Sequence, residues 1–182
     1  MKSINVKYIG KCTDIKAEQV VDILNKENIG FEPISIVNWD AEYPYRPKVA
    51  FRIAHTDSCI LLHYSVTEKS VRAKYALDND PVWTDSCVEF FLSPDSNKFY
   101  YNIECNCIGT ILEGIGDGRQ DRQRATAEIT KQIDRWASLG DMPFDELDNE
   151  TSWEIALVIP VSVFTESTIT ALKGKTMAAN FY

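Results

Sequence analysis

The 182-residue sequence lacks the long apolar run that a membrane-spanning helix requires. No segment approaches the roughly 18–20 consecutive apolar residues needed to cross a bilayer. The opening MKSINVKYIGKCTDIKAEQ places a polar residue at every second or third position and contains no apolar core typical of a signal peptide. We therefore expect no membrane partner. We also expect a cytoplasmic location for the sequence as given, or a periplasmic or secreted one if a leader has been removed.

Positive charge is also scarce, because 19 Lys and Arg residues oppose 27 Asp and Glu residues and leave a net charge of −8. Nucleic acids and anionic membranes attract basic surfaces, so this balance argues against a nucleic-acid partner. Neutral sugars, cations and basic proteins are compatible with it. The oligomeric state is not indicated by the sequence.

Cysteine is present without the spacing of a disulfide framework. The number is odd, which favours free thiols in a reducing compartment; the five are Cys12, Cys59, Cys87, Cys105 and Cys107. Cys105 and Cys107 share the apolar side of one expected strand and have no second cysteine pair or nearby histidine. We therefore interpret them as buried thiols and predict no metal site there.

What is present indicates one mainly β domain over residues 1–182, without repeats or linkers. Residues 14–27 form the clearest helix, with Asp14 as N-cap and Gly30 as stop signal. From residue 34 onward apolar residues alternate with polar ones, and 125–136 is compatible with helix or strand. The further strands are expected around 1–13, 34–39, 49–53, 60–67, 71–75, 86–92, 99–107, 111–115, 153–159 and 175–182. We predict an antiparallel β-sandwich of jelly-roll or immunoglobulin-like type, with a closed barrel as alternative.

The stretch from Pro81 to Gly109 is typical of two strands joined by a turn at 93–98. Val88, Phe90 and Leu92 alternate with polar residues, as do Phe99, Tyr101, Ile103 and Cys105 on the second strand. Pairing Leu92 with Phe99 places all these apolar side chains on one face. The same register places Glu89 opposite Asn102, Cys87 opposite Glu104 and Asp85 opposite Asn106.

The resulting polar face has the chemistry of a sugar site, because carboxylates and amides bind hydroxyl groups and Trp83 offers an aromatic plane. Its members are Trp83, Asp85, Glu89, Asn102, Glu104 and Asn106. The simpler interpretation is a solvent-facing sheet surface, with Trp83 covering the edge of the core.

The runs VWTDSCVEFFLSP and YYNIECNCIGT resemble the hairpin of family 9 carbohydrate-binding modules, which belong to the DOMON-like β-sandwiches. The segments ISIVNW, PKVAFRIAH, ILLHYSV and WEIALVIPVSVF fall where that family's other strands would lie. The resemblance spans the chain from about residue 30 onward.

The resemblance implies non-catalytic binding of oligo- or polysaccharide ends between two aromatic rings. Trp83 matches one ring, Glu89 a hydroxyl-binding carboxylate and Asn106 an amide that binds hydroxyls. Glu104 stands where a basic residue is expected. The second ring would come from near the end of the chain, so Tyr182 or Trp136 is the candidate.

Two other functions are open. The sandwich could serve protein–protein association or an accessory role in sugar metabolism, in which case the polar face would be flat or covered. Alternatively, Glu89 and Glu104 could be diagonal neighbours across the two strands, with their Cβ atoms about 7–8 Å apart. That separation falls in the roughly 6.5–9.5 Å range of inverting glycosidases. A concave groove holding Trp83, Glu89 and Asn106 with a facing aromatic would favour the binding module.

Three further predictions concern the remaining polar and aromatic residues. We predict no cofactor, although the oxygen-rich loops 78–81 and 116–121 could hold a structural Ca²⁺. The tryptophans Trp39, Trp136 and Trp153 occupy apolar-face positions that favour the core. The cations Arg72, Lys74 and Arg119 could reach a ligand but are interpreted as solvated.

Overall fold

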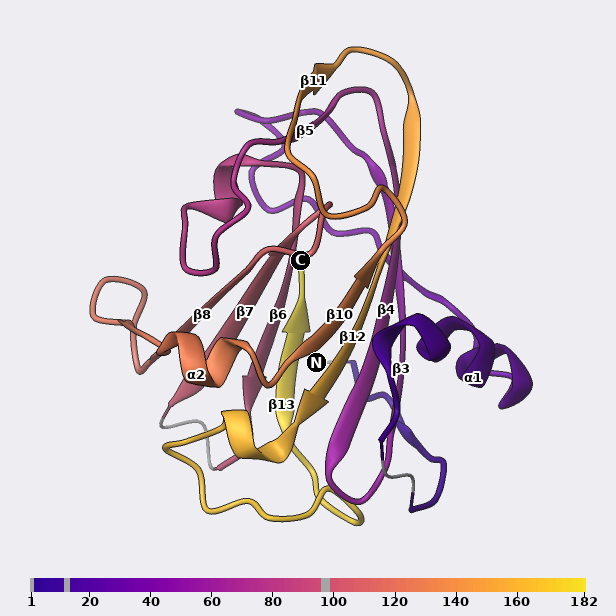
Figure 1. Cartoon of the computed structure of the whole chain (residues 1–182), viewed down its shortest axis with the longest axis vertical. Coiled ribbons are helices and arrows are strands. Elements are labelled where there is room, and N and C mark those ends of the chain that lie inside the picture. Colours follow the sequence, from indigo (N-terminus) through magenta and orange to yellow (C-terminus); the bar gives the residue numbers. More distant parts are fainter. Residues whose placement is uncertain (1, 12–13, 96–98) are drawn as a thin grey trace.

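The protein is described by a computed structural model that covers residues 2–11, 14–95 and 99–182 (Figure 1). One sheet has the strand order β1-β3-β4-β12-β10, with β2 also paired to β3. These strands are β1 (Lys7–Tyr8), β2 (Glu32–Ile34), β3 (Lys48–His55), β4 (Cys59–Glu68), β10 (Asp134–Ala137) and β12 (Thr151–Pro160). All pairs in this sheet are antiparallel except β1 with β3.

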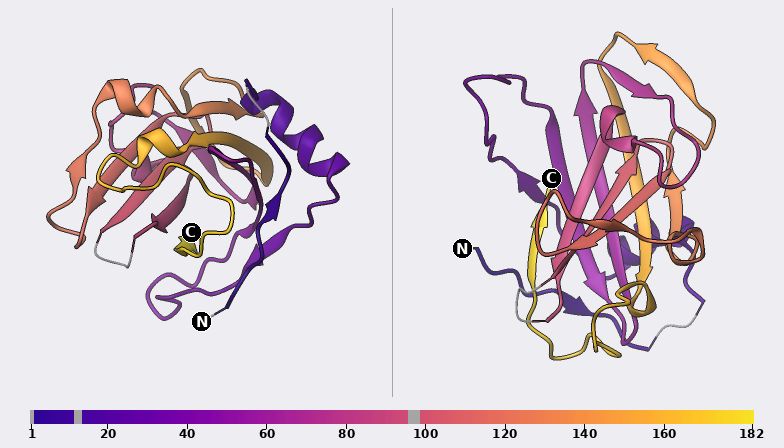
Figure 2. Two further views of the ribbon diagram at one scale, coloured as in Figure 1. Left: turned by 90° about the horizontal axis from the view of Figure 1, so that it is seen from below. Right: turned by 90° about the vertical axis from the view of Figure 1, so that its left-hand side faces the viewer.

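The second sheet has five strands in the order β13-β6-β7-β8-β9. They are β13 (Ala178–Phe181), β6 (Cys87–Ser93), β7 (Tyr100–Asn106), β8 (Ile111–Gly116) and β9 (Gln123–Arg124). A short ribbon pairs β5 (Val71–Ala73) with β11 (Phe144–Leu147). Figure 2 shows the two sheets as facing layers, so the predicted β-sandwich is confirmed.

The core lies between the two sheets and follows the period-two alternation of their strands. Val88, Phe90 and Leu92 of β6 are buried there, as the sequence predicts. Phe181 of β13 stacks on Phe51 of β3, with ring centroids 3.5 Å apart. This contact ties the last strand to the opposite sheet.

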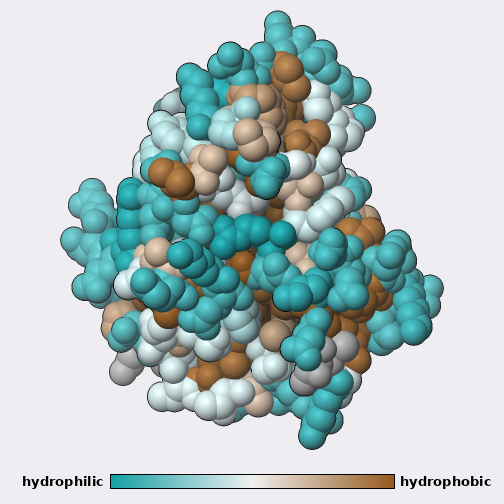
Figure 3. Space-filling view, viewed as in Figure 1, coloured by the Kyte–Doolittle hydropathy of each residue, from teal (hydrophilic) through white to brown (hydrophobic). Residues whose placement is uncertain are grey.

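The N-terminal helix covers the outer face of the six-stranded sheet. It consists of a 3₁₀ turn, η1 (Ala17–Gln19), followed by α1 (Val20–Lys26). Val20 and Leu24 are fully buried against strands β3, β4 and β12. Figure 3, in the orientation of Figure 1, shows hydrophobic surface in patches, including one next to α1 at the right of the view. Within the described residues no helix has the length and hydrophobicity of a membrane span.

Two local predictions about this helix are wrong. Asp14 is not its N-cap but adopts a left-handed φ of 64° three residues before the helix begins. The first turn is instead closed by the Lys16 N–H, which donates to Gln19 Oε1 at 2.9 Å. The helix ends at Lys26, and Asn28, with φ of 54°, turns the chain before Gly30 is reached.

Several predicted strands have different limits. β1 and β5 are short, and β2 ends at Ile34, so that residues 35–47 form a loop instead of continuing as a strand to residue 39. The ambiguous segment 125–136 contains both α2 (Ala127–Thr130) and the start of β10. Two further 3₁₀ turns are η2 (Val82–Thr84), just before β6, and η3 (Val161–Val163), after β12.

The register of the central hairpin differs from the prediction by two residues. Leu92 lies opposite Tyr101 instead of Phe99, and Glu89 lies opposite Glu104. Because side chains alternate with period two, this shift leaves each side chain on its predicted face and changes only its partner. Phe99 is largely exposed and lies outside β7. The predicted turn at 93–98 falls partly on residues 96–98, outside the described residues.

Candidate functional site

A groove of about 770 Å³ lies on the outer face of the five-stranded sheet. Its floor is formed by side chains of β6, β7 and β8, and its rim by the loops around them. Its aromatic lining consists of Trp39, Trp83, Phe91, Tyr100 and Tyr182. The remaining lining residues are Glu89, Glu104, Leu112, Gly114, Arg119, Arg122 and Arg124. Carboxylates, guanidinium groups and aromatic rings thus meet in one concave site, as ligand sites require.

Two tryptophans and a tyrosine are exposed in this groove. Trp83 stands on η2 with half of its surface accessible, and Trp39 comes from the loop 35–47 with 55% accessible. Tyr182 meets Trp39 edge-on, with ring centroids 6.3 Å apart. Its backbone exchanges two hydrogen bonds with Glu89, of 2.8 and 2.9 Å, which hold the tyrosine beside the floor. Trp39 was predicted in the core, and that prediction is wrong.

A carboxylate pair forms part of the floor. Glu89 and Glu104 are directly opposite across β6 and β7, and Asn102 donates through Nδ2 to Glu89 Oε2 at 3.1 Å and to Glu104 Oε1 at 2.7 Å. Burial, and secondarily the charge of Glu89, raises the pKa of Glu104 to about 7. Burial also raises the pKa of Glu89. Glu104 Oε2 and Asn102 Oδ1 are buried without a hydrogen-bond partner in the described part of the chain.

The predicted diagonal spacing of the two glutamates is wrong because of the two-residue register shift. Asn102 Nδ2 donates to both carboxylates, at 3.1 Å to Glu89 Oε2 and 2.7 Å to Glu104 Oε1. The distance between these two oxygens therefore cannot exceed the sum of the two hydrogen-bond lengths. Inverting glycosidases separate their carboxyl groups by about 6.5–9.5 Å to hold a water between them. The pair in this groove is too close for that arrangement.

Arginines form one wall of the groove. Arg122 Nη1 lies 3.7 Å from Glu104 Oε1, so a guanidinium from a neighbouring loop stands next to the position where the family resemblance places a basic residue. Its backbone can approach β8 because Gly116 has no side chain, and a Cβ there would lie 3.1 Å from Arg122 Cα. Arg124 Cζ lies 5.9 Å from the centroid of the Trp83 ring. Sequence reasoning set Arg119 aside and missed Arg122 and Arg124.

Asp85 and Asn106 lie behind the groove instead of lining it. Asp85 Oδ2 accepts hydrogen bonds from the backbone N–H groups of Lys74 and Tyr75 at 3.0 and 3.1 Å. Asn106 is fully buried, donates to Tyr75 O and Asp85 Oδ2, and accepts from the Thr110 N–H at 2.8 Å. The two side chains therefore fix the loops that carry Trp83. The Asn106 amide and Asp85 Oδ2 are thus bonded within the protein, and Asp85 Oδ1 lies 3.5 Å from Arg72 Nε.

The other two tryptophans lie outside the groove. Trp153 is buried in the core, as predicted, and its Nε1–H donates to Glu68 Oε1 at 2.7 Å. Trp136 packs partly against the cluster under the N-terminal helix and lines a separate hollow next to Arg135. Of the two candidates for the second ring, only Tyr182 therefore lies with Trp83.

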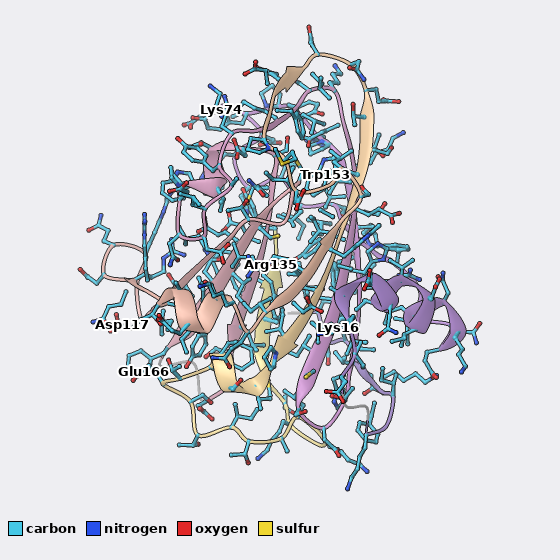
Figure 4. The ribbon with its side chains drawn as sticks, in the orientation of Figure 1. Lys16, Lys74, Asp117, Arg135, Trp153 and Glu166 are labelled. Atoms are coloured by element: carbon cyan, nitrogen blue, oxygen red, sulfur yellow. The ribbon has the colours of Figure 1, made fainter. Side chains whose placement is uncertain are left out.

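The loops considered for Ca²⁺ have other contacts. Asp78 forms an ion pair with Arg135, which Figure 4 labels near the centre of the molecule, at 2.6 Å. Within residues 2–11, 14–95 and 99–182, no three His, Cys, Asp or Glu residues are grouped to hold a metal ion. Cys105 and Cys107 are buried free thiols, and Cys12 lies outside the described residues.

Comparisons with known proteins agree with this architecture. A protein from Bacteroides uniformis, provisionally described as carbohydrate-binding, is 47% identical and superposes with a TM-score of 0.95 over all of this chain and 83% of its own. A family 9 module from Caldicellulosiruptor kristjanssonii, solved with glucose, is 12% identical, with a TM-score of 0.50 over 97% of this chain and 76% of its own. Its complex with cellotriose gives a TM-score of 0.51 at the same identity, over 97% of this chain and 75% of its own.

A search of curated proteins gave no match. The family model described as "Carbohydrate-binding family 9" matches residues 18–182, nearly the whole sequence. On this match, and on the 47% identity over the full chain, the protein belongs to carbohydrate-binding family 9.

Proposed function

We propose that the chain is a non-catalytic module that binds the end of an oligo- or polysaccharide in the groove between Trp83, Trp39 and Tyr182. The observation that carries the proposal is the placement of three exposed aromatic rings around a floor of hydroxyl-binding carboxylates. Exposed tryptophans are costly in water, and rings presented around a polar floor suit a ligand that has both an apolar face and hydroxyl groups. A pyranose ring has both.

Glu89 and Glu104 supply the polar contacts in this proposal. Carboxylates accept hydrogen bonds from hydroxyl groups, and Glu104 Oε2 has no partner among the described residues. Asn102 orients both carboxylates from behind by donating to each of them. The relatives solved with glucose and cellotriose support sugars as the ligand class, while their low identity leaves the individual contacts as part of the proposal.

The proposal does not include hydrolysis. Family 9 modules are non-catalytic, and the two floor glutamates lie too close together for the inverting arrangement that their predicted spacing suggested. Association with other proteins has less support, because the predicted polar face forms a groove instead of a flat or helix-covered surface.

A glycan array followed by calorimetric titration tests the proposal. We expect the wild-type protein to bind oligosaccharides and Trp83→Ala to lose at least about tenfold in affinity, since aromatic contacts dominate such sites. Trp136→Ala is the matched control, because Trp136 lies outside the groove, and should keep its affinity. Absence of binding by wild type across the array would refute the proposal. Release of chromophore from an aryl glycoside, abolished by Glu89→Gln, would show an enzyme instead.

A further inference from the structure

The arginine wall of the groove carries more positive charge than the two carboxylates of its floor can neutralise. Arg119, Arg122 and Arg124 all come from β9 and the loop before it. They face two carboxylates, those of Glu89 and Glu104. An excess of guanidinium groups in one groove contrasts with the net charge of −8 for the whole chain.

These guanidinium groups are only partly occupied by the protein itself. Arg122 Nη1 is buried and has no hydrogen-bond partner in the described part of the chain, although it lies within ion-pair distance of Glu104. Arg124 Nη1 donates to the carbonyl of Asn79 at 2.6 Å, a neutral partner. Within the described residues neither Arg119 nor Arg124 forms an ion pair with a carboxylate.

The acidic residues of the same loop do not enter the groove. Asp117, labelled at the left edge of the molecule in Figure 4, and Asp121 are both exposed and absent from the lining. On the floor, the raised pKa of Glu104 means that part of its negative charge is absent near neutral pH. Neither the loop nor the floor therefore cancels the arginine wall.

We infer that the groove selects a sugar that carries an anionic group, which the arginine wall binds while the ring lies against Trp83. This inference rests on the proposed function and narrows its ligand class. Guanidinium groups bind carboxylate, sulfate and phosphate through paired, charge-assisted hydrogen bonds. The hydroxyl groups of the same sugar are left for Glu89 and Glu104, so that the two kinds of charge in the groove bind different parts of the ligand.

Calorimetry with sugars that differ only in charge tests the inference. Glucose is compared with glucuronate, glucose 6-sulfate and glucose 6-phosphate, and galactose with galacturonate, at pH 7.5. We expect at least one anionic sugar to bind about tenfold or more tightly than its neutral counterpart, and the three glucose derivatives identify which anion is preferred. The preference should shrink when the ionic strength rises from about 0.05 to about 0.5 M, because salt screens partly exposed charges.

Paired variants separate the arginine wall from charge in general. Arg119→Gln combined with Arg124→Gln should abolish the preference, so that charged and neutral sugars bind the variant with equal affinity. Lys131→Gln combined with Lys175→Gln removes the same charge from exposed positions outside the groove and should keep the preference. Equal affinities for charged and neutral sugars, or a preference that survives in the arginine variant, would overturn the inference and leave the proposed function intact. If wild type binds none of these sugars and no oligosaccharide on the array, both fall.

Discussion

The two outer faces of the sandwich use the same alternation of side chains and reach opposite outcomes. On the six-stranded sheet, Arg52 and His63 point outward and are buried under the N-terminal helix. Arg52 Nε–H donates to His63 Nδ1 at 2.9 Å and its Nη1–H to Asn25 Oδ1 at 2.7 Å. His63 Nε2 lies 3.3 Å from Glu154. This Nε2 has no hydrogen bond in the described part of the chain, but it is buried and lies within ion-pair distance of Glu154, whereas the other polar groups named here are bound by the protein itself.

On the five-stranded sheet, Asn102 and Glu104 are as deeply buried, yet Asn102 Oδ1 and Glu104 Oε2 lack partners within the described residues. Among residues 2–11, 14–95 and 99–182 no α-helix lines this groove, and exposed rings surround its floor instead. Buried polar atoms in native proteins are nearly always bonded, so unpartnered ones at an open groove indicate a ligand or ordered water. Unpartnered atoms occur on both faces, so the comparison shows that access distinguishes them: His63 is buried under the helix, whereas Glu104 lines an open groove.

The largest expected effect is on the covered face. Leu24→Ala removes a fully buried side chain between helix and sheet and should lower the free energy of unfolding by about 2–5 kcal/mol. Sugar affinity, measured well below the unfolding temperature, should stay unchanged. Chemical denaturation gives the first quantity and calorimetry the second. A parallel loss of affinity would show that the two faces are coupled.

Glu113 extends the comparison to a carboxyl group that does not line the sugar groove. It is fully buried, neither of its oxygens has a partner in the described part of the chain, and burial raises its pKa to about 8. The folded state therefore keeps its proton above the usual range, and stability should fall as the pH rises from about 4.5 to about 8.

Glu113→Gln replaces the titrating carboxyl group with an amide that does not ionise. The difference in unfolding free energy between the variant and wild type should shift in favour of the variant by on the order of 3 kcal/mol from pH 5 to pH 9. Denaturant titrations of both proteins at the two pH values measure the change, and effects of other titrating groups cancel in the difference. The same difference in unfolding free energy at both pH values would show that Glu113 is ionised in the folded state.

Asn106 distinguishes a supporting residue from a ligand-binding one. Its amide bonds lie within the protein, so Asn106→Ala should lower the free energy of unfolding by about 2 kcal/mol through unpaired buried groups. The folded protein should bind sugar within about twofold of wild type. A large loss of affinity at unchanged stability would restore the direct contact that the family resemblance implies.

The smallest expected effect is a pH dependence of sugar binding. An ionised carboxylate accepts stronger hydrogen bonds than a protonated one, so affinity for a neutral sugar should rise a few-fold between pH 6 and pH 8 as Glu104 loses its proton near pH 7. Titrations across this range should give a flat profile for Glu104→Gln. Equal slopes for the two proteins would assign the dependence to another group.

The sandwich and the faces of its central hairpin could be predicted because the alternation of Val88, Phe90 and Leu92 marks one side of β6. The pairing partners across β6 and β7 could not be predicted, because a two-residue shift preserves that alternation. The distance between Glu89 and Glu104 therefore also differs from the prediction. The hairpin motif carried the family resemblance and the place of Trp83.

The groove walls were harder to predict because they come from loops. Trp39 reaches the groove only through the path of the loop 35–47, and Arg122 through a close approach to Gly116. Neither path follows from local periodicity, which describes strands and helices. The tyrosine and proline run after Trp39, YPYRP, was a signal that the strand had ended.

The four tryptophans allow one direct test of the central claim, that sugars bind on the uncovered face of the five-stranded sheet. Each indole N–H gives a separate signal in a ¹H–¹⁵N NMR spectrum, assigned by single substitution. On addition of a bound oligosaccharide, the signals of Trp39 and Trp83 should shift, whereas those of Trp136 and the buried Trp153 should not. Shifts confined to Trp136, with Trp39 and Trp83 unmoved, would contradict the account.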